Sequence, residues 1–391
     1  MNGQLVDRVR LRLATGPDSA GDSELAAVAG AESALLLDTA ALSELSGQLR
    51  AELTGAGPLE SLLADPAVTD VLVNAADSVW IDRGRGLERA GVSFESDGAV
   101  RRLAARLAAQ AGRRLDDAAP FVDAMLADGT RLHAILPPLV AHPTISLRVL
   151  GRRRLSLPEL VMLEAMSPDL AELLTALVTA RLSILVSGGT GTGKTSLLAA
   201  LLSSADPGDR IITIEDAAEL SIDHPHVVAL LARSANVERA GAVQLAELVR
   251  QALRMRADRL VVGEFRAAEI VDLLAALNTG HSGGAATVHA NSVADVPARL
   301  VALAALGGMD PATLAAQAAS ALDVLVHLRR DRGGVRRVDQ IGLWPRLGSG
   351  LGPELVWTRA AGLGPAAAEL RSRLADAETE LPFLLQAVDR P

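Results

Sequence analysis

One octapeptide of this chain carries the residue types that bind a triphosphate. Residues 188–195 read Gly-Gly-Thr-Gly-Thr-Gly-Lys-Thr and fit the pattern G-x-x-x-x-G-K-[ST], with an apolar strand before them and a helical pattern after them. Glycines let the backbone curl so that several N–H groups point at phosphate oxygens, and the following helix adds a partial positive charge. We therefore predict that this phosphate-binding loop holds ATP with Mg²⁺. The predicted nucleotide-binding residues here are Gly188, Gly189, Thr190, Gly191, Thr192, Gly193, Lys194, Thr195 and Ser196.

Lysine is almost absent from the chain, and its single occurrence lies inside this loop. Of 38 basic residues, 37 are Arg and one, Lys194, is Lys. A genome that favours Arg codons explains the bias, so a surviving Lys marks a place where Arg cannot substitute. The lysine head group is a compact point charge, whereas arginine is a wide planar fork. We predict that Lys194 neutralises the β- and γ-phosphates and that the hydroxyl of Thr195 ligates Mg²⁺.

Three further functional groups directly follow short apolar segments. The expected strands and the groups after them are 211–214 with Glu215, 260–262 with Glu264 (after Gly263), and 285–288 with His289. Strands that alternate with helices form a parallel sheet, and ligands lie outside the carboxyl ends of such strands. The two carboxylates and the imidazole are therefore expected at the same edge of the sheet as the phosphate-binding loop.

Phosphoryl transfer assigns roles to these groups, because its transition state needs a positioned water, metal contact and charge neutralisation. We predict a catalytic set of Lys194, Glu215, Glu264 and His289. Glu215 is the better candidate for orienting the attacking water, and Glu264 for holding the Mg²⁺ shell through water. The spacing does not separate the two glutamates, so an exchange of roles, with Glu215 near the metal, stays open. His289 is a candidate donor to the γ-phosphate.

Three arginines are candidates for contacting the nucleotide. Arg233 follows an expected strand at 227–231, and Arg254 shares a helix face with Arg250 at a spacing of four. Arg148 ends the last strand before a charged segment, and it would reach a nucleotide bound between two domains. The alternative for each is a solvated or ion-paired position.

The chain divides by pattern into five segments. They are an Ala- and Leu-rich helical extension (1–55), an α+β domain (56–149), a charged linker (150–156), an α/β domain with a mostly parallel sheet (157–332) and a Gly- and Pro-rich tail of unassigned role (333–391). Within the α+β domain, Asp128-Gly129 predicts a tight hairpin, and the strand at 78–82 is expected to pair with one at 91–94.

Composition excludes several classes of protein. Cysteine is absent, which removes disulfides, thiol catalysis and Cys-based zinc sites. A net charge of −9 and only 2% aromatic residues argue against direct nucleic-acid binding. No apolar run reaches the ~18–20 residues of a membrane span, and no signal segment is visible. We expect a cytoplasmic protein whose association with a membrane depends on partners.

Taken together, the motifs resemble those of a known family. Segments 188–195, 210–219, 260–266 and 278–291 are similar to the P-loop, Asp box, Walker B motif and His box of type II and type IV secretion ATPases. Segments 128–131 and 145–148 resemble signatures of the CpaF-like branch, which drives assembly of Tad (Flp) pili. Met125 stands where that branch carries Arg, and Ser196, Ser282 and Gly284 also depart from the common residues.

The resemblance implies a RecA-like P-loop ATPase domain, preceded by a smaller PAS-like α+β domain. It further implies a homo-hexamer that hydrolyses ATP, works on inner-membrane platform proteins of a pilus or secretion system, and lies at the inner face of the cell membrane. The Gly263-Glu264 form of the Walker B motif is expected in this family. Two alternatives stay open: a conjugation ATPase that serves DNA transfer, and a nucleotide-binding regulatory subunit without significant hydrolysis.

Overall fold

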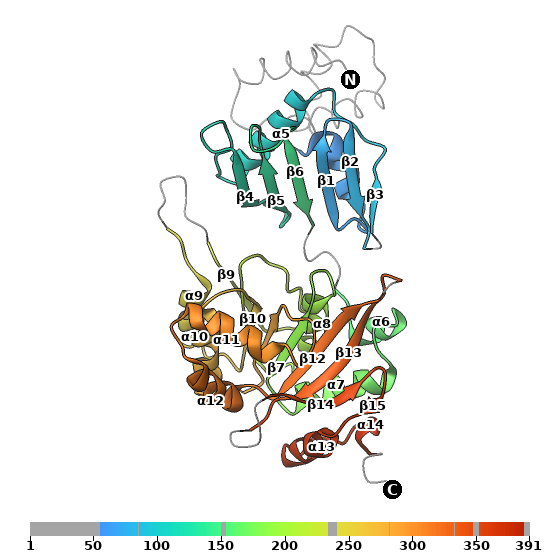
Figure 1. Cartoon of the computed structure of the whole chain (residues 1–391), viewed down its shortest axis with the longest axis vertical. Helices are drawn as coiled ribbons and strands as arrows, with labels where there is room; N and C mark the ends of the chain where they lie inside the picture. The colour runs from blue at the N-terminus through green and yellow to red at the C-terminus, as the bar shows by residue number, and fades with distance from the viewer. Residues whose placement is uncertain are drawn as a thin grey trace. The chain divides into compact units, whose positions relative to one another are not determined.

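The chain forms two compact units, 1–150 and 151–391 (Figure 1). The computed structural model describes residues 55–84, 86–149, 154–233, 241–280, 282–331, 333–346 and 352–386. Residues 1–54 of the predicted helical extension and residues 150–153 of the predicted linker lie outside this range. Each unit is described by itself below.

The first unit is a six-stranded antiparallel sheet covered by a helix. Its strands are β1 (Asp70–Ala75), β2 (Ser78–Asp82), β3 (Leu87–Arg89), β4 (Phe121–Met125), β5 (Arg131–Ile135) and β6 (Thr144–Arg148). The strand order is β3-β2-β1-β6-β5-β4. Its helical elements are η1 (Gly57–Leu59), α4 (Glu60–Ala64) and α5 (Asp97–Gln110), and the Ser96 side chain caps α5 by accepting a hydrogen bond from Ala99 N.

Strict alternation of apolar residues builds the core of this unit. Along β2 and β5, every second residue is buried, and Val100, Leu103 and Leu107 of α5 pack onto the same face. The hairpin around Asp128-Gly129 forms between β4 and β5. The predicted strand at 91–94 is wrong: β2 pairs with Leu87–Arg89 instead, so the turn between the two strands is shorter than the sequence suggested.

The second unit is an α/β domain built on a nine-stranded sheet. Its strands are β7 (Ile184–Gly188), β8 (Ile211–Glu215), β9 (Val227–Leu231), β10 (Arg259–Phe265), β11 (Ala285–Val288), β12 (Val324–Arg330), β13 (Arg336–Leu343), β14 (Glu354–Thr358) and β15 (Gly362–Leu363). The order is β15-β14-β13-β12-β7-β11-β10-β8-β9, and the six strands from β12 to β9 are parallel. Every residue of β7 and β8 is buried, as expected for strands covered on both faces.

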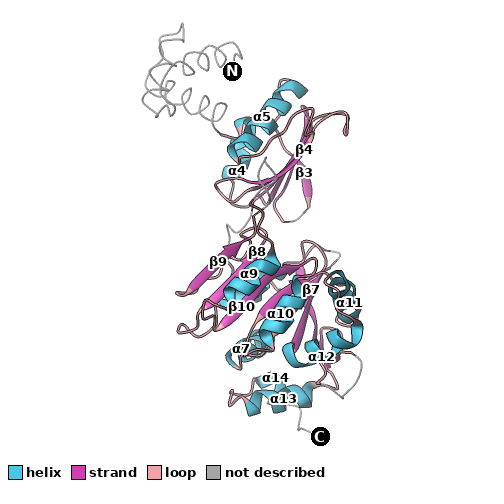
Figure 2. Ribbon diagram, turned by 90° about the vertical axis from the view of Figure 1, so that its left-hand side faces the viewer, coloured by secondary structure: helices cyan, strands magenta, loops and turns pink. Residues whose placement is uncertain are grey.

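Helices cover both faces of this sheet. One face carries α6 (Leu157–Met162), α7 (Pro168–Thr179), α8 (Lys194–Leu202), α13 (Ala367–Asp376) and α14 (Phe383–Gln386). The other carries α9 (Leu245–Ala252), α10 (Glu269–Leu277), α11 (Val296–Leu306) and α12 (Pro311–Ala321). Figure 2 shows α9 and α10 lying over the strands at the β9 end of the sheet. The architecture is that of a RecA-like ATPase domain.

The segment after residue 332 is part of this sheet. The strand β13 pairs antiparallel with β12, and β14 and β15 follow it outward. A buried arginine anchors α13 to the sheet, since Arg373 donates to the Trp344 carbonyl at 3.1 Å and approaches Asp323 at 3.5 Å. Asp323 in turn accepts a hydrogen bond from Ser183 N, next to β7. The tail thus supports the central strands.

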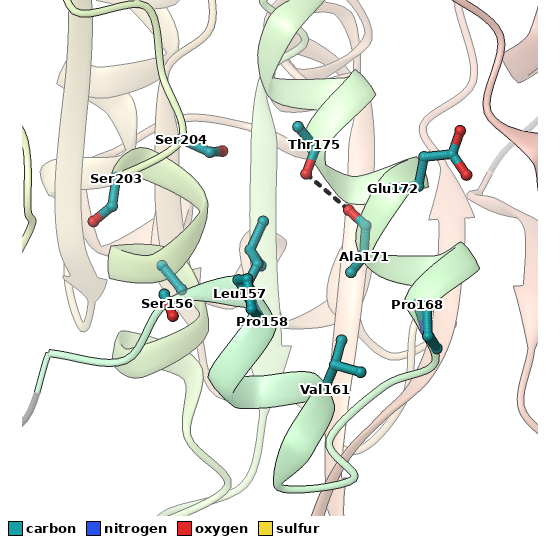
Figure 3. Close-up of a pocket in the computed structure, with 11 residues that line it drawn as sticks. Ser156, Leu157, Pro158, Val161, Pro168, Ala171, Glu172, Thr175, Ser203 and Ser204 are labelled. Atoms are coloured by element: carbon teal, nitrogen blue, oxygen red, sulfur yellow. Dashed lines mark hydrogen bonds between the residues drawn. The ribbon is translucent and has the colours of Figure 1, made fainter.

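A cavity of about 530 Å³ lies between α6, α7 and the last turn of α8 (Figure 3). Its walls are mostly apolar, from Leu157, Val161 and Ala171, with Ser203 and Ser204 on one side. Leu157 and Ala171 lie in the first turns of α6 and α7, and Ser203 follows the C-terminal end of α8, whereas the phosphate-binding loop precedes the first turn of α8.

No single helix within the described ranges has the length and apolarity needed to cross a membrane. The helices α11 and α12 reach that length and composition only as a pair, and they are bent by 117° at the break between them.

Candidate nucleotide site

The phosphate-binding loop follows β7 and leads into α8, and its glycines are required by its shape. Gly188 has φ +154°, and a Cβ there would lie 2.6 Å from the Leu328 carbonyl and 2.6 Å from Thr192 Oγ1. Gly191 and Gly193 have φ values of +70° and +92°, and Gly193 is the N-cap of α8. These backbone conformations suit glycine and few other residues. The glycines therefore permit the curled shape of the loop.

The remaining loop residues lie in two environments. Gly189, Thr190, Gly191 and Ser196 are exposed, so a ligand in solution can reach this part of the loop. Thr192 is buried, and its hydroxyl donates to the Gly189 carbonyl at 2.9 Å, which closes the curl from inside.

Lys194 is buried at the first position of α8, with 7% of its surface exposed. Its Nζ donates to the carbonyls of Gly188 and Gly189, both at 3.1 Å, and to Nδ1 of His289 at 3.2 Å. Burial lowers the pKa of the Lys194 ammonium, and the nearby Glu264 carboxylate opposes that shift. The ammonium is thus held under the loop, at the point where the loop turns back on itself.

Glu264 and His289 lie beside this ammonium, at the ends of β10 and β11. Glu264 Oε1 is 2.7 Å from Nε2 of His289 and 4.0 Å from Lys194 Nζ. Its second oxygen, Oε2, accepts from Nε of Arg266 at 2.6 Å. Burial and the adjacent Lys194 charge lower the pKa of His289, so its ring is neutral at pH 7. A neutral ring that accepts at Nδ1 from Lys194 donates at Nε2 to Glu264, and this network assigns the tautomer.

Glu215 ends β8 and is buried, with 4% of its surface exposed. Its Oε1 accepts from the backbone N–H groups of Glu219 (3.1 Å) and Leu220 (2.9 Å). Burial nevertheless raises the pKa of Glu215 to about 7. Such a carboxyl group changes charge near neutral pH, as a general base requires.

Gly263 makes room for this carboxylate. A Cβ at position 263 would lie 2.9 Å from Cγ of Glu215 and 3.2 Å from its Oε1. The Gly263 carbonyl also accepts from the buried Thr287 hydroxyl at 2.7 Å, which ties β10 to β11. Glycine before Glu264 therefore allows the β8 and β10 carboxylates to lie on neighbouring strands with no side chain between them.

The oxygen atoms near Thr195 fit a hard cation. Thr195 Oγ1 lies 3.5 Å from Glu219 Oε2, and hydroxyl and carboxylate oxygens are the ligands that Mg²⁺ uses together with phosphate oxygens. In the part of the chain that the structure describes, no group of three or more His, Asp or Glu side chains is arranged to hold a metal ion. Protein ligands alone would therefore not complete an octahedral shell here.

The arginines selected from sequence do not join this cluster within the second unit. Arg233 follows β9, and β9 is four strand positions from β7, which corresponds to about 19 Å between the two strands. The Nε of Arg233 donates to the Gly241 carbonyl at 2.7 Å. Arg254 follows α9 and reaches Gln251 Oε1 at 3.4 Å. Arg148, in the first unit, is half-exposed and donates to Asp70 Oδ1 at 2.9 Å.

Two arginines that sequence reasoning left unassigned do contact the site. Arg266 holds Glu264, as described above, and lies 3.8 Å from Asp216. Arg336, from β13, donates its Nε–H to the Gly191 carbonyl at 2.8 Å. Arg266 was detectable because it follows Glu264 by two residues, whereas nothing in the sequence connects Arg336 to a loop 145 residues before it.

Similarity to known proteins agrees with this geometry. Residues 52–334 match the family model described as "Type II/IV secretion system protein". A putative conjugal transfer protein of Mycobacterium tuberculosis is 53% identical over 347 residues, which cover 87% of this chain and 98% of that protein. The conjugal transfer protein TrbB of Rhizobium radiobacter is 30% identical over 71% of this chain and 84% of its own length.

Solved structures agree at the level of the fold. The crystal structure of the Legionella pneumophila ATPase DotB matches 72% of this chain and 79% of its own, with a TM-score of 0.52 and 20% identity. Because the family model covers well over half of the sequence, and the two relatives match over most of their lengths, the chain belongs to the type II/IV secretion ATPase family.

Proposed function

We propose that this protein hydrolyses ATP and that the energy powers a pilus or secretion apparatus. One observation carries the proposal: Lys194, His289 and Glu264 form a continuous hydrogen-bonded chain beneath the phosphate-binding loop. A structural ion pair would not need a loop of exposed glycines above it. An ammonium, an imidazole and a carboxylate at one sheet edge suit the binding and cleavage of a triphosphate.

We propose that nucleotide binding rearranges the contacts between Lys194, His289 and Glu264. Lys194 Nζ is held by two loop carbonyls and His289, and it is 4.0 Å from Glu264. Phosphate oxygens above the loop would accept from Lys194 and from loop N–H groups, while Thr195 and, through water, Glu264 hold Mg²⁺. A Mg²⁺ ion held by these residues would neutralise charge on the β- and γ-phosphates. His289 Nε2–H is then available to the γ-phosphate.

Glu215 is the group that we assign to orienting the attacking water. It is buried, and its pKa of about 7 lets it accept a proton near neutral pH. Glu264, by contrast, has both oxygens engaged by His289 and Arg266, which suits a role in holding charge and metal-bound water. The geometry therefore favours Glu215 as the base and Glu264 as the metal-side carboxylate.

We further propose that the active form is a homo-hexamer at the inner face of the cell membrane, bound to platform proteins. Membership of the secretion ATPase family supports this assembly. The segments that resemble the CpaF-like branch support a Tad (Flp) pilus as the machine. In that arrangement, Arg148, Arg233 and Arg254 are candidates for phosphate contacts made between domains or between subunits.

A second candidate function is service to a conjugation apparatus. Two relatives are named as conjugal transfer proteins, and they cover most of this chain. The net charge of −9 argues against direct DNA contact, but an ATPase that drives a transfer channel need not touch DNA.

The central test is phosphate release by the purified full-length protein with Mg²⁺ and ATP. Wild type should hydrolyse ATP, whereas Glu215→Gln and Glu264→Gln should bind ATP and lose hydrolysis. Sedimentation with ATP should reveal a hexamer. If wild type bound ATP with no turnover under any condition, the regulatory-subunit alternative would replace this proposal.

A genetic test separates the two machines. Deletion of the gene in its own bacterium should abolish surface pili and leave plasmid transfer intact if the Tad (Flp) assignment is correct. Loss of plasmid transfer with normal pili would support the conjugation candidate instead.

A further inference from the structure

The hairpin of β12 and β13 runs alongside the phosphate-binding loop. Leu328 of β12 pairs with Gly188, the last residue of β7, so the residues after Leu328 continue past the point where the loop begins. At this end of the hairpin, Arg330 lies opposite Arg336, and Arg329 lies opposite Arg337. Four arginines therefore stand in two cross-strand pairs next to the loop.

The two pairs are not equivalent in their surroundings. Arg329 binds Asp339 at 3.1 Å, and Arg337 binds Glu164 at 3.0 Å and Asp331 at 3.2 Å. In the other pair, Arg330 Nε donates to the Gly334 carbonyl at 3.1 Å, within the hairpin itself. Arg336 Nε instead donates to the Gly191 carbonyl at 2.8 Å, across to the loop.

The Arg336 side chain lies against the phosphate-binding loop, close to the residue at which α8 begins. Its guanidinium reaches Gly191, and its Cδ lies 3.4 Å from the place that a Cβ of Gly193 would occupy. The side chain is exposed, and Gly189, Thr190 and Gly191 beside it are exposed as well. A guanidinium carries five N–H donors in a rigid fork that matches phosphate oxygens, and the Gly191 carbonyl takes the Nε–H.

We propose that Arg336 binds a phosphate of the nucleotide from within the same chain, while its Nε–H fixes the apex of the loop through Gly191. This inference rests on the proposed function, because it assumes that the loop holds a nucleotide. The inference makes the segment after β12 part of the nucleotide site. Within one subunit, Arg336 then makes the phosphate contact for which Arg233 and Arg254 were the candidates.

The test is nucleotide affinity, measured without hydrolysis. Fluorescent ADP is titrated with the full-length protein and followed by anisotropy, with unlabelled ADP, AMP and adenosine as competitors. Arg336→Ala should weaken ADP binding about tenfold or more and leave adenosine binding within about twofold, because a phosphate contact depends on charge. Arg336→Lys should retain more affinity than Arg336→Gln, since lysine keeps the charge.

Arg330→Ala is the matched control, because it removes the same charge from the opposite position of the same hairpin. It should change ADP affinity less than about threefold. Equal losses in Arg330→Ala and Arg336→Ala would overturn the inference, since they would indicate general hairpin charge. Unchanged ADP affinity in Arg336→Ala would overturn it as well. Circular dichroism and thermal melting of each variant identify any loss of ADP affinity that is caused by unfolding. If Arg336→Ala is unfolded, the ADP affinity of a folded Arg336→Gln is compared with that of wild type instead.

Lys194→Ala separates this inference from the proposed function. If Lys194→Ala loses ADP binding and Arg336→Ala does not, the inference fails and the proposed function stands. If wild type and Lys194→Ala bind ADP equally well, the proposed function itself fails.

Discussion

Glu264 Oε1 and His289 Nε2 lie 2.7 Å apart, and this contact joins the ends of two neighbouring parallel strands. The other ring nitrogen of His289 faces Lys194 at 3.2 Å. A single imidazole therefore connects the ammonium that we assign to the phosphates with the carboxylate that we assign to the metal side. The pKa of His289 is lowered, which keeps the ring neutral and able to accept on one side and donate on the other.

Replacement of His289 should affect turnover more than binding. His289→Ala removes the acceptor of Lys194 and the donor to Glu264, so we expect kcat to fall about 100-fold, which is typical for the loss of one donor to transition-state charge. Affinity for ADP should change less than about threefold. The control is His224→Ala, because His224 lies in a loop of the same unit, where its ring contacts the Asp206 carbonyl and the His226 N–H. Equal losses in both variants would contradict the assignment.

The charge of Glu215 should make stability depend on pH. Its folded-state pKa is about 7, above its ordinary value of 4.5, so between these pH values the folded protein holds a proton that the unfolded chain has released. This contribution is complete below pH 4.5 and is lost as pH rises through 7. Glu215→Gln removes the dependence and keeps an oxygen for the N–H groups of Glu219 and Leu220. The variant should therefore become more stable than wild type above pH 7, by up to about 3 kcal/mol.

Thermal melting between pH 5 and pH 8.5 measures this difference. The gap between the two proteins should widen as pH rises and close towards pH 5. In parallel, hydrolysis by wild type should increase with pH through an apparent pKa near 7, because the base acts in its ionised form. A constant gap across the range would show that Glu215 is ionised in both states.

A methyl group at position 263 should disturb Glu215. The Cβ of Gly263→Ala would lie 2.9 Å from Glu215 Cγ, closer than real Cβ atoms approach, so the glutamate must shift. We expect hydrolysis to fall by about 100-fold while ADP binding persists, because misplacement by about 1 Å has this effect on a positioned group. Gly352→Ala is the control: a Cβ there meets nothing within 4 Å. Normal turnover in Gly263→Ala would show that Glu215 tolerates displacement.

Arginine should not replace the single lysine. Lys194 is buried and its Nζ already contacts two carbonyls and a ring nitrogen, so a planar guanidinium has no room in the same place. Lys194→Arg should lose ADP binding at least tenfold although the charge is kept, as measured by anisotropy. Near-normal binding would mean that charge alone matters, and that the shape of the arginine side chain does not explain why lysine persists there.

Local patterns predicted most of the cluster. The phosphate-binding loop is contiguous, and Glu215, Glu264 and His289 each directly follow an apolar run, so the parallel sheet brings them to one edge. The contacts that the sequence did not reveal join positions far apart in the chain. Arg336 reaches Gly191 across 145 residues, and among 37 arginines no spacing distinguishes it.

The order of the strands in the sheet could not be predicted from local sequence patterns either. Arg233 follows a strand, as Glu215 does, and this likeness made it a candidate. Its strand, β9, is at the far edge of the sheet, and only the pairing of β8 with β9 reveals that position. The predicted partner of β2 is wrong for a related reason: residues 91–94 have strand composition, but β2 pairs with Leu87–Arg89, which is closer along the chain.

The scarcity of lysine has a practical consequence for chemical probing. Lys194 holds the one side-chain primary amine of the chain, and burial raises the fraction of that amine that is neutral and nucleophilic. Amine-reactive reagents such as succinimidyl esters or pyridoxal phosphate with borohydride therefore have one internal target, in the floor of the loop. Peptide mass mapping of that single adduct, with and without ADP, would report occupancy directly, and no mutation or added dye would be needed.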